Sequence, residues 1–298
     1  MFVSFGFSCQ TRFSIDAVSF DFLRRPFDFN ITSQQGLVRA FMTDGQSLRP
    51  AFEDFSIFTM PVEKRQGVEA NGIYFWHDFP IEADSLSLAA NWEDSLDKVN
   101  KKYASLWPRF AALLRSDHPK TLVVSNSQSN LQQFSSDEAD FDRKFGLGPD
   151  AFLKINQALL DFGARNFKLQ FLTRTLSDLE RCLRQIDDPC FEAQFVGTLS
   201  PPFNTMVAAS LVCAHYIDIA QACGSFDGQD KLVKQISDRS ALIYRNASGD
   251  YVLWASIMAM RDGYLASFAG HNKVFKAVID SGDLYFSNRT KWIRDPGG

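Results

Sequence analysis

FVSFGFSCQ, residues 2–10, has the pattern of a short buried strand that stops at a cysteine. Its aromatic residues and Val3 favour extended backbone, and Gly6 allows another segment to approach closely. In α/β proteins ligands bind beyond the carboxyl ends of the strands, which is where Cys9 falls. We therefore expect a strand over residues 2–7 and a thiol at the edge of a sheet, flanked by Ser8 and Gln10.

Apolar runs and helical periodicity alternate along the rest of the chain. Further strands are expected at 72–76, 121–125, 167–173 and 192–198, and helices at 33–42, 92–115, 150–162, 176–185 and 205–222. This alternation predicts an α/β fold with a mostly parallel sheet and helices on both faces.

The C-terminal part shows a different pattern. Residues 241–245 and 250–259 flank the turn sequence Asn246-Ala247-Ser248-Gly249, and a second pair is expected at 273–279 and 284–286. These hairpins predict an antiparallel C-terminal elaboration of a single α/β domain, 1–298. The polar stretch 126–144 is the expected long surface loop, and it could divide the chain into parts 1–130 and 145–298.

Composition places the chain among globular proteins. Hydrophobic residues make up 45% and charged residues 22%, so most of the 29 phenylalanines should lie in the core. A net charge of −4 disfavours a nucleic-acid partner. The apolar run 206–222 is interrupted by Ser210, His215 and Asp218, which favours a buried helix over a membrane span.

The five cysteines, at positions 9, 182, 190, 213 and 223, form no C-x-x-C pair. With no secretory leader pattern at the N-terminus, this usage predicts a reduced, cytoplasmic protein. Phosphate-binding glycine motifs are missing, and the acidic residues between 137 and 142 are expected to be solvated. We therefore expect no cofactor and no metal site.

Cys9 and His77 are the candidate nucleophile and base. A neighbouring imidazole raises the thiolate fraction of a cysteine, and a third polar group would hold the ring in its productive tautomer. Asp28 and Asn126 are candidates for that third group, since Asp78 should point away from its neighbour His77 on extended backbone. The structural alternatives are a buried cysteine that acts as a small apolar residue and a histidine packed among aromatic rings.

Three blocks of the sequence resemble one known family. The order Gly6-x-x-Cys9, then Arg25-Pro26-Phe27-Asp28-Phe29, then His77-Asp78-Phe79 is similar to a bacterial family of unknown function that is catalogued as papain-like cysteine peptidases. The resemblance covers roughly residues 1–130 and continues through Lys102-Tyr103, Arg109 and the strand at 121–124.

The resemblance implies a cysteine-dependent hydrolase or acyl transferase acting on a peptide, amide or thioester. Gln10 and the amides after Cys9 would then stabilise an oxyanion, and Arg25, Asp78 and Arg174 would bind substrate. It also implies a papain-like α+β fold as the alternative, with a cysteine that opens a long helix. The strand–helix alternation and the weak helical pattern of 10–18 argue against that alternative.

Two other functions stay open at this point. A glycosyltransferase or sugar-modifying protein would hold a phosphate-containing ligand on Arg25 and Arg174 at the strand ends. A non-catalytic binding module would use the same cleft. These charged residues could also be purely structural. In that case Asp28 would form a salt bridge with an arginine such as Arg24 and fix a turn. A small molecule, a peptide or a glycan is the expected partner, and the sequence does not indicate an oligomeric state.

Overall fold

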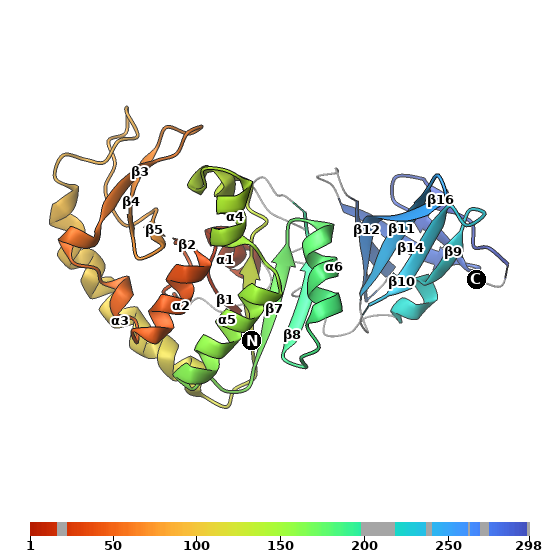
Figure 1. Cartoon of the computed structure of the whole chain (residues 1–298), viewed down its shortest axis with the longest axis horizontal. Helices are drawn as coiled ribbons and strands as arrows, with labels where there is room; N and C mark the ends of the chain where they lie inside the picture. The colour runs from red at the N-terminus through yellow and green to blue at the C-terminus, as the bar shows by residue number, and fades with distance from the viewer. Residues whose placement is uncertain (17–22, 198–217, 237–239, 262, 269–273, 297–298) are drawn as a thin grey trace. The chain divides into compact units, whose positions relative to one another are not determined.

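Figure 1 shows the computed structural model of the chain, which describes residues 1–16, 23–197, 218–236, 240–261, 263–268 and 274–296. The chain forms two compact units, and we describe each by itself. Unit 1 comprises Met1–Leu172 and Ile186–Glu192, and unit 2 comprises Thr173–Gln185 and Ala193–Gly298.

A four-stranded sheet in the order β1-β6-β7-β8 contains the parallel pairs. Its strands are β1 (Phe2–Ser4), β6 (Lys120–Ser125), β7 (Phe167–Thr173) and β8 (Phe191–Phe195). β6 pairs in parallel with both β1 and β7. The buried runs of β6 and β7 are apolar on both faces, as a parallel sheet covered by helices requires. The predicted α/β class with parallel strands is confirmed.

A second sheet in unit 1 is antiparallel, in the order β2-β5-β4-β3. Its strands are β2 (Ile31–Thr32), β3 (Ser56–Thr59), β4 (Gln66–Ala70) and β5 (Ile73–Phe75). The strand predicted at 72–76 therefore exists as β5, but it pairs with β2 and β4 and not with the parallel strands. The prediction of a mostly parallel sheet is corrected in this region, because a short apolar run does not specify its pairing partner.

The helices of unit 1 follow the predicted pattern in most places. They are α1 (Cys9–Asp16), α2 (Gln34–Met42), α3 (Leu96–Arg115), α4 (Glu138–Phe145) and α5 (Pro149–Phe162), with the 3-10 turns η1 (Gln46–Leu48), η2 (Phe52–Asp54), η3 (Trp92–Ser95) and η4 (Ser129–Phe134). Ser33 caps α2 by accepting a hydrogen bond from the Gly36 amide, and α3 continues through Pro108.

Two expectations about these helices are corrected. Residues 9–16 form an α-helix, although the sequence predicted weak helicity after Cys9. The stretch 126–144, expected as a loop or boundary, lies inside unit 1 and forms η4 and α4. Asp137 caps α4 by accepting a bond from the Asp140 amide, and Phe141 and Phe145 bury its apolar face. The many polar residues of this stretch obscured the helical spacing of Phe141 and Phe145 in the sequence.

Aromatic rings form much of the core of unit 1. Phe5 after β1 packs against Phe41 of α2, with ring centroids 5.4 Å apart, and against Phe27 at 6.0 Å. Phe110 of α3 adds a ring 5.7 Å from Phe27. All four are buried, as the phenylalanine content predicted. Phe41 also packs on Phe162 of α5, which joins α2 to α5.

Unit 2 contains an eight-stranded antiparallel sheet in the order β16-β15-β14-β13-β12-β11-β10-β9. The strands are β9 (Gly224–Phe226), β10 (Lys231–Gln235), β11 (Ser240–Ala247), β12 (Asp250–Met260), β13 (Gly263–Phe268), β14 (Val274–Asp280), β15 (Asp283–Phe286) and β16 (Lys291–Trp292). The two predicted hairpins correspond to β11–β12 and β14–β15. The antiparallel C-terminal elaboration is confirmed, and it is larger than the sequence indicated.

The antiparallel sheet nearly closes into a barrel. The residues after β16 return to β9, where the Asp227 amide donates to the Ile293 carbonyl at 2.8 Å and Phe226 bridges Arg294. The interior is apolar and includes Ala255, Ile257 and Ala259 of β12. We call this element the near-barrel sheet.

One helix of unit 2 covers the outer surface of the near-barrel sheet. α6 (Leu176–Gln185) has the predicted bounds and packs Leu176 and Leu179 against Leu242 of β11. Most of the helix predicted at 205–222 lies outside the described residues, and residues 219–222 form the 3-10 turn η5 (Ile219–Ala222).

Candidate functional site

The turn between β1 and α1 has strained backbone. Gly6 has a φ of 88° and Phe7 a φ of 64°, so two consecutive residues lie in the left-handed region. This conformation is uncommon for a residue other than glycine and costs on the order of 1–3 kcal/mol, which surrounding structure must offset. Phe7 is fully buried, with its ring 5.8 Å from that of Phe145. The strained turn brings the chain directly from the strand into a helix that begins at Cys9.

Cys9 lies at the N-terminus of α1 with 8% of its surface exposed. The free amides and the dipole of a helix N-terminus favour the thiolate form of a cysteine. The Cys9 Sγ lies 3.8 Å from Oε1 of Gln128, which follows the carboxyl end of the neighbouring parallel strand β6. The structure therefore places the predicted nucleophile at the sheet edge, as expected, and adds Gln128 beside it.

Asp28 forms a buried charge cluster with α1. Its Oδ2 accepts a hydrogen bond from the Arg25 amide at 2.7 Å and lies 3.5 Å from Nη1 of Arg12, one turn after Cys9 on α1. Arg12, Arg25 and Asp28 are all buried. Burial raises the pKa of Asp28 to about 6, against the opposing effect of Arg12. The cluster joins the Arg25–Phe29 block to the helix that carries Cys9.

Asp78 connects the His77–Phe79 block to the same segment of chain. Its carboxylate pairs with Lys102 and accepts a bond from the Tyr103 hydroxyl at 2.8 Å. That hydroxyl also contacts the Asn30 side chain, and Asn30 donates to the Pro26 carbonyl at 3.2 Å. The three sequence blocks thus meet in unit 1 through the Arg12–Asp28 and Asn30–Tyr103–Asp78 contacts.

His77 is exposed, and its ring packs against the edge of Trp76. Although the ring reaches the surface, desolvation by the protein on its other side lowers its pKa, and the Arg65 charge lowers it further. The imidazole is therefore neutral near pH 7 and able to accept a proton. Among the described residues, no hydrogen bond joins His77 to Cys9, Asp28 or Asn126.

Several buried polar atoms around this turn lack a hydrogen-bond partner within the described part of the chain. They are Ser4 Oγ, Ser8 Oγ, Thr11 Oγ1, Asp28 Oδ1 and Thr32 Oγ1. An unsatisfied buried polar group costs about 1–3 kcal/mol, so each one needs an explanation. All five belong to the β1–α1 segment or to the 28–32 segment that contacts it, and they give the surroundings of Cys9 unused capacity to bind a polar group.

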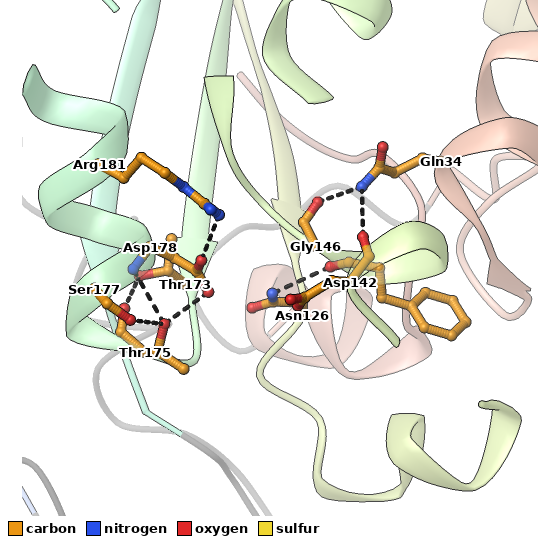
Figure 2. A network of polar contacts seen from close by, with 10 residues as sticks. Gln34, Asn126, Asp142, Gly146, Thr173, Thr175, Ser177, Asp178 and Arg181 are labelled. Atoms are coloured by element: carbon orange, nitrogen blue, oxygen red, sulfur yellow. Dashed lines mark hydrogen bonds and ion pairs between the residues drawn. The ribbon is translucent and has the colours of Figure 1, made fainter. Parts of the chain in front are cut away.

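Asn126 directly follows β6, as expected for a residue that ends this strand, and it is buried. The Asn126 Nδ2 donates to the Phe145 carbonyl at 3.1 Å. The carbonyl of Gly146, the residue that follows α4, accepts a hydrogen bond from the Gln34 side chain (Figure 2). These contacts hold the end of α4 against β6 and α2. Asn126 therefore has a structural contact at the position where the sequence predicted an orienting group for His77.

The polar residues after β7 cap a helix in unit 2. Asp178 accepts a bond from the Thr175 hydroxyl at 2.7 Å and pairs with Arg181 at 2.8 Å, and its amide donates to Thr175 Oγ1 (Figure 2). The predicted substrate ligand Arg174 lies in this segment and is half-buried. This cap stabilises the start of α6, which is the purely structural use of polar residues at a strand end. The side chain of Gln10 lies outside the described residues.

Gln128 and Arg12 are the two contacts that sequence reasoning missed. Gln128 is 119 positions from Cys9, and only the parallel pairing of β1 with β6 brings it close. A spacing of three residues from Cys9 on a helix would have indicated Arg12, but the helix itself was not expected there.

Among the described residues, no cluster of three metal-binding side chains occurs, and no helix is long and apolar enough to cross a membrane.

A comparison with protein-family models, curated proteins and solved structures found no match to this chain. The resemblance to the papain-like cysteine peptidases therefore depends on the three sequence blocks alone.

Proposed function

We propose that this chain is a cysteine-dependent hydrolase or acyl transferase in which Cys9 is the nucleophile. The observation that carries the proposal is the β1–α1 turn, where two left-handed residues lead into a helix that begins at Cys9. A sharp turn from strand to helix exposes a nucleophile to the helix amides, which also suit a developing oxyanion. Strain of this kind clusters at functional sites.

The proposed reaction forms and breaks one acyl bond in each of two steps. The Cys9 thiolate attacks the carbonyl carbon of an ester, thioester or amide, and the amides that open α1 stabilise the oxyanion. The leaving group departs with the proton that His77 has taken from the Cys9 thiol, which leaves an acyl thioester on Cys9. Water or an acceptor nucleophile then releases the acyl group and restores the thiol.

His77 is the proposed carrier of the proton in this reaction. Its lowered pKa keeps the imidazole neutral near pH 7, so it can take a proton from water or from the thiol. Cys9 contacts Gln128, and within the part of the chain that the structure describes no hydrogen bond joins it to His77; catalytic hydrogen bonds are often long before substrate binds. Asp28 is buried beside α1 and supports the position of the helix through Arg12.

Acetylation by p-nitrophenyl acetate tests the nucleophile. We expect a burst of p-nitrophenolate and one acetyl group on the peptide that contains Cys9, as identified by mass spectrometry. Cys9→Ala should abolish both, whereas Cys190→Ala, a matched change at a half-buried cysteine, should leave them intact. An unchanged burst in Cys9→Ala would contradict the proposal and favour a non-catalytic binding module.

A second variant separates the two roles. His77→Ala should slow deacylation by a factor of about 100 to 10,000 and leave the acetyl group on Cys9 detectable for longer. Equal rates in His77→Ala and the unaltered protein would exclude His77 as the base and leave Cys9 as the nucleophile.

A further inference from the structure

A pocket of about 110 Å³ lies in the near-barrel sheet of unit 2. Five successive strands, β12 to β16, each contribute one aromatic side chain to its wall: Trp254, Phe268, Phe275, Phe286 and Trp292. Trp254 and Trp292 are stacked, with centroids 5.9 Å apart and planes 23° apart. The pocket is thus surrounded by ring faces and ring edges, which are rigid contact surfaces with few rotatable bonds.

A break in strand register points one of these rings inward. Ile243 of β11 pairs with Ala255 of β12, but the next residue, Tyr244, pairs with Leu253, so Trp254 is left over as a bulge. Leu253 packs with α6 on the outer face, whereas Trp254 and Ala255 both pack with the interior. Bulges re-aim side chains and are common at barrel rims and beside functional sites. Regular pairing would have turned Trp254 outward.

The protein's own cations already occupy two of the ring faces. The Arg245 guanidinium lies 5.4 Å from the Trp254 ring, and the Lys231 ammonium lies 5.4 Å from the Trp292 ring. Lys231 is held there by Asp227 at 2.7 Å and Asp230 at 2.9 Å. A cationic ligand would compete with these groups for the same rings, and none of the described residues that line the pocket is charged. The lining that the structure describes therefore favours a neutral ligand.

The other two lining residues among those that the structure describes are polar and neutral. Asn288 and Thr290 lie in the turn from β15 to β16, and both are exposed. The Asn288 Oδ1 accepts a bond from the Thr290 amide at 3.0 Å, which fixes the shape of the turn. Both side chains line the pocket, and their remaining polar groups are an amide and a hydroxyl. An apolar pocket with a few placed polar groups is the usual form of a small-molecule site.

We propose that this aromatic pocket binds one ring of a neutral saccharide. The C–H face of a pyranose ring packs against aromatic rings, while its hydroxyl groups exchange hydrogen bonds with an amide and a hydroxyl at the edge. The aromatic wall matches the C–H face of such a ring, and the polar turn matches its hydroxyl groups. The pocket is lined by residues of unit 2, and this proposal does not depend on the acyl-transfer proposal.

Binding of methyl glycosides to the full chain tests the proposal. The probes are the methyl glycosides of glucose, galactose, mannose and N-acetylglucosamine, measured by saturation-transfer NMR and by tryptophan fluorescence. We expect at least one to bind saturably with millimolar affinity. Trp254→Ala should weaken this binding at least about tenfold, whereas Tyr251→Ala, an exposed aromatic on the same strand outside the lining, should not.

Two exposed substitutions keep the test decisive if Trp254→Ala fails to fold. Asn288→Ala and Thr290→Val lie in an exposed turn, and each should weaken glycoside binding about three- to tenfold through a lost hydrogen bond. Glycoside binding that survives all three substitutions would overturn the proposal. So would the failure of every glycoside to bind, or the binding of tetramethylammonium or benzene in their place.

Discussion

The turn around Cys9 in unit 1 and the aromatic pocket in unit 2 both depart from regular backbone, but their surroundings differ. The turn has two left-handed residues, buried charges and buried polar atoms that have no hydrogen-bond partner among the described residues. The pocket has one bulge and walls made of rings that also form the core. The comparison teaches that buried charges and buried polar groups concentrate around Cys9, where we propose chemistry. A binding pocket can instead be built from aromatic groups that stabilise the fold, with its left-handed residue, Arg289, in the exposed turn at its edge.

The largest expected effect comes from breaking the charge cluster in unit 1. Arg12→Ala leaves Asp28 buried without its nearest cation, and loss of one partner of a buried ion pair costs about 3–5 kcal/mol. We expect the free energy of unfolding of unit 1 to fall by about that amount, with unit 2 unchanged. Hydrogen exchange read by mass spectrometry in increasing urea would report each unit separately.

Arg143→Ala is the matched control for this prediction. It removes an arginine from an exposed pair with Asp140, which should cost less than about 1 kcal/mol. Equal costs for the two variants would show that the Arg12–Asp28 cluster is no more important than a surface pair.

The second effect is a pH dependence of opposite sign in the two units. Burial raises the pKa of Asp28 from 3.8 to about 6, so between these values the folded form binds more protons than the unfolded chain. The free energy of unfolding of unit 1 should therefore fall, by up to about 3 kcal/mol, as the pH rises from about 4 to 6. Asp28→Asn should remove this slope, as measured by urea unfolding across that range.

Asp283 in unit 2 supplies the contrast. Its hydrogen bond from the Arg294 amide, together with Lys291, lowers its pKa, so its stabilising contribution is present above the ordinary carboxyl pKa and is lost as the pH falls. If the stability of unit 1 falls with rising pH in Asp28→Asn as it does in the unaltered protein, another group causes the pH dependence.

A smaller effect is expected at the strained turn. Gly6→Ala places a side chain on a residue with φ of 88°, within 3.4 Å of Leu37, and should cost about 1–2 kcal/mol. Because the turn positions Cys9, acetylation by p-nitrophenyl acetate should also slow. Gly163→Ala is the control, since it has a φ of 86° and open space around it. It should cost a similar backbone strain and leave acetylation unchanged; slowing in both variants would mean that the turn has no specific role.

The smallest effect concerns the pocket of unit 2. Arg245→Met removes the cation over Trp254 and should lower the stability of unit 2 by about 0.5–1 kcal/mol. If the resident cations are what exclude a cationic ligand, this variant should bind tetramethylammonium more tightly than the unaltered protein, as measured by fluorescence titration. Unchanged affinity would remove that part of the selectivity argument.

Local patterns predicted much of this fold. β7 and α6 were found with their bounds because an apolar run and an amphipathic period are encoded by neighbouring residues. The hairpin β11–β12 was found from its turn sequence at 246–249. The partners of β5 were not predicted, since a three-residue apolar strand fits either kind of sheet.

The candidate site was predictable only in part, because contacts between distant segments are not encoded in a local pattern. The local pattern predicted a strand over residues 2–7 that stops at Cys9, whereas β1 ends at Ser4 and Cys9 is the first residue of α1. The contact of Gln128 with Cys9 depends on the pairing of β1 with β6. The inward direction of Trp254 depends on a register shift between β11 and β12. The proposed base His77 illustrates the limit, because three matched sequence blocks meet in unit 1 without a hydrogen bond from His77 to Cys9.

The return of residues 293–295 to β9 has a consequence for how unit 2 behaves in a crowded solution. The Asp295 amide donates to the Ser225 carbonyl at 3.0 Å, so the segment that follows β16 satisfies backbone groups at the free edge of β9. Exposed strand edges are templates for aggregation and for exchange of strands between molecules. Substituting proline at Asp295, which removes that donor, should open this seam and convert a self-contained sheet into one prone to domain swapping.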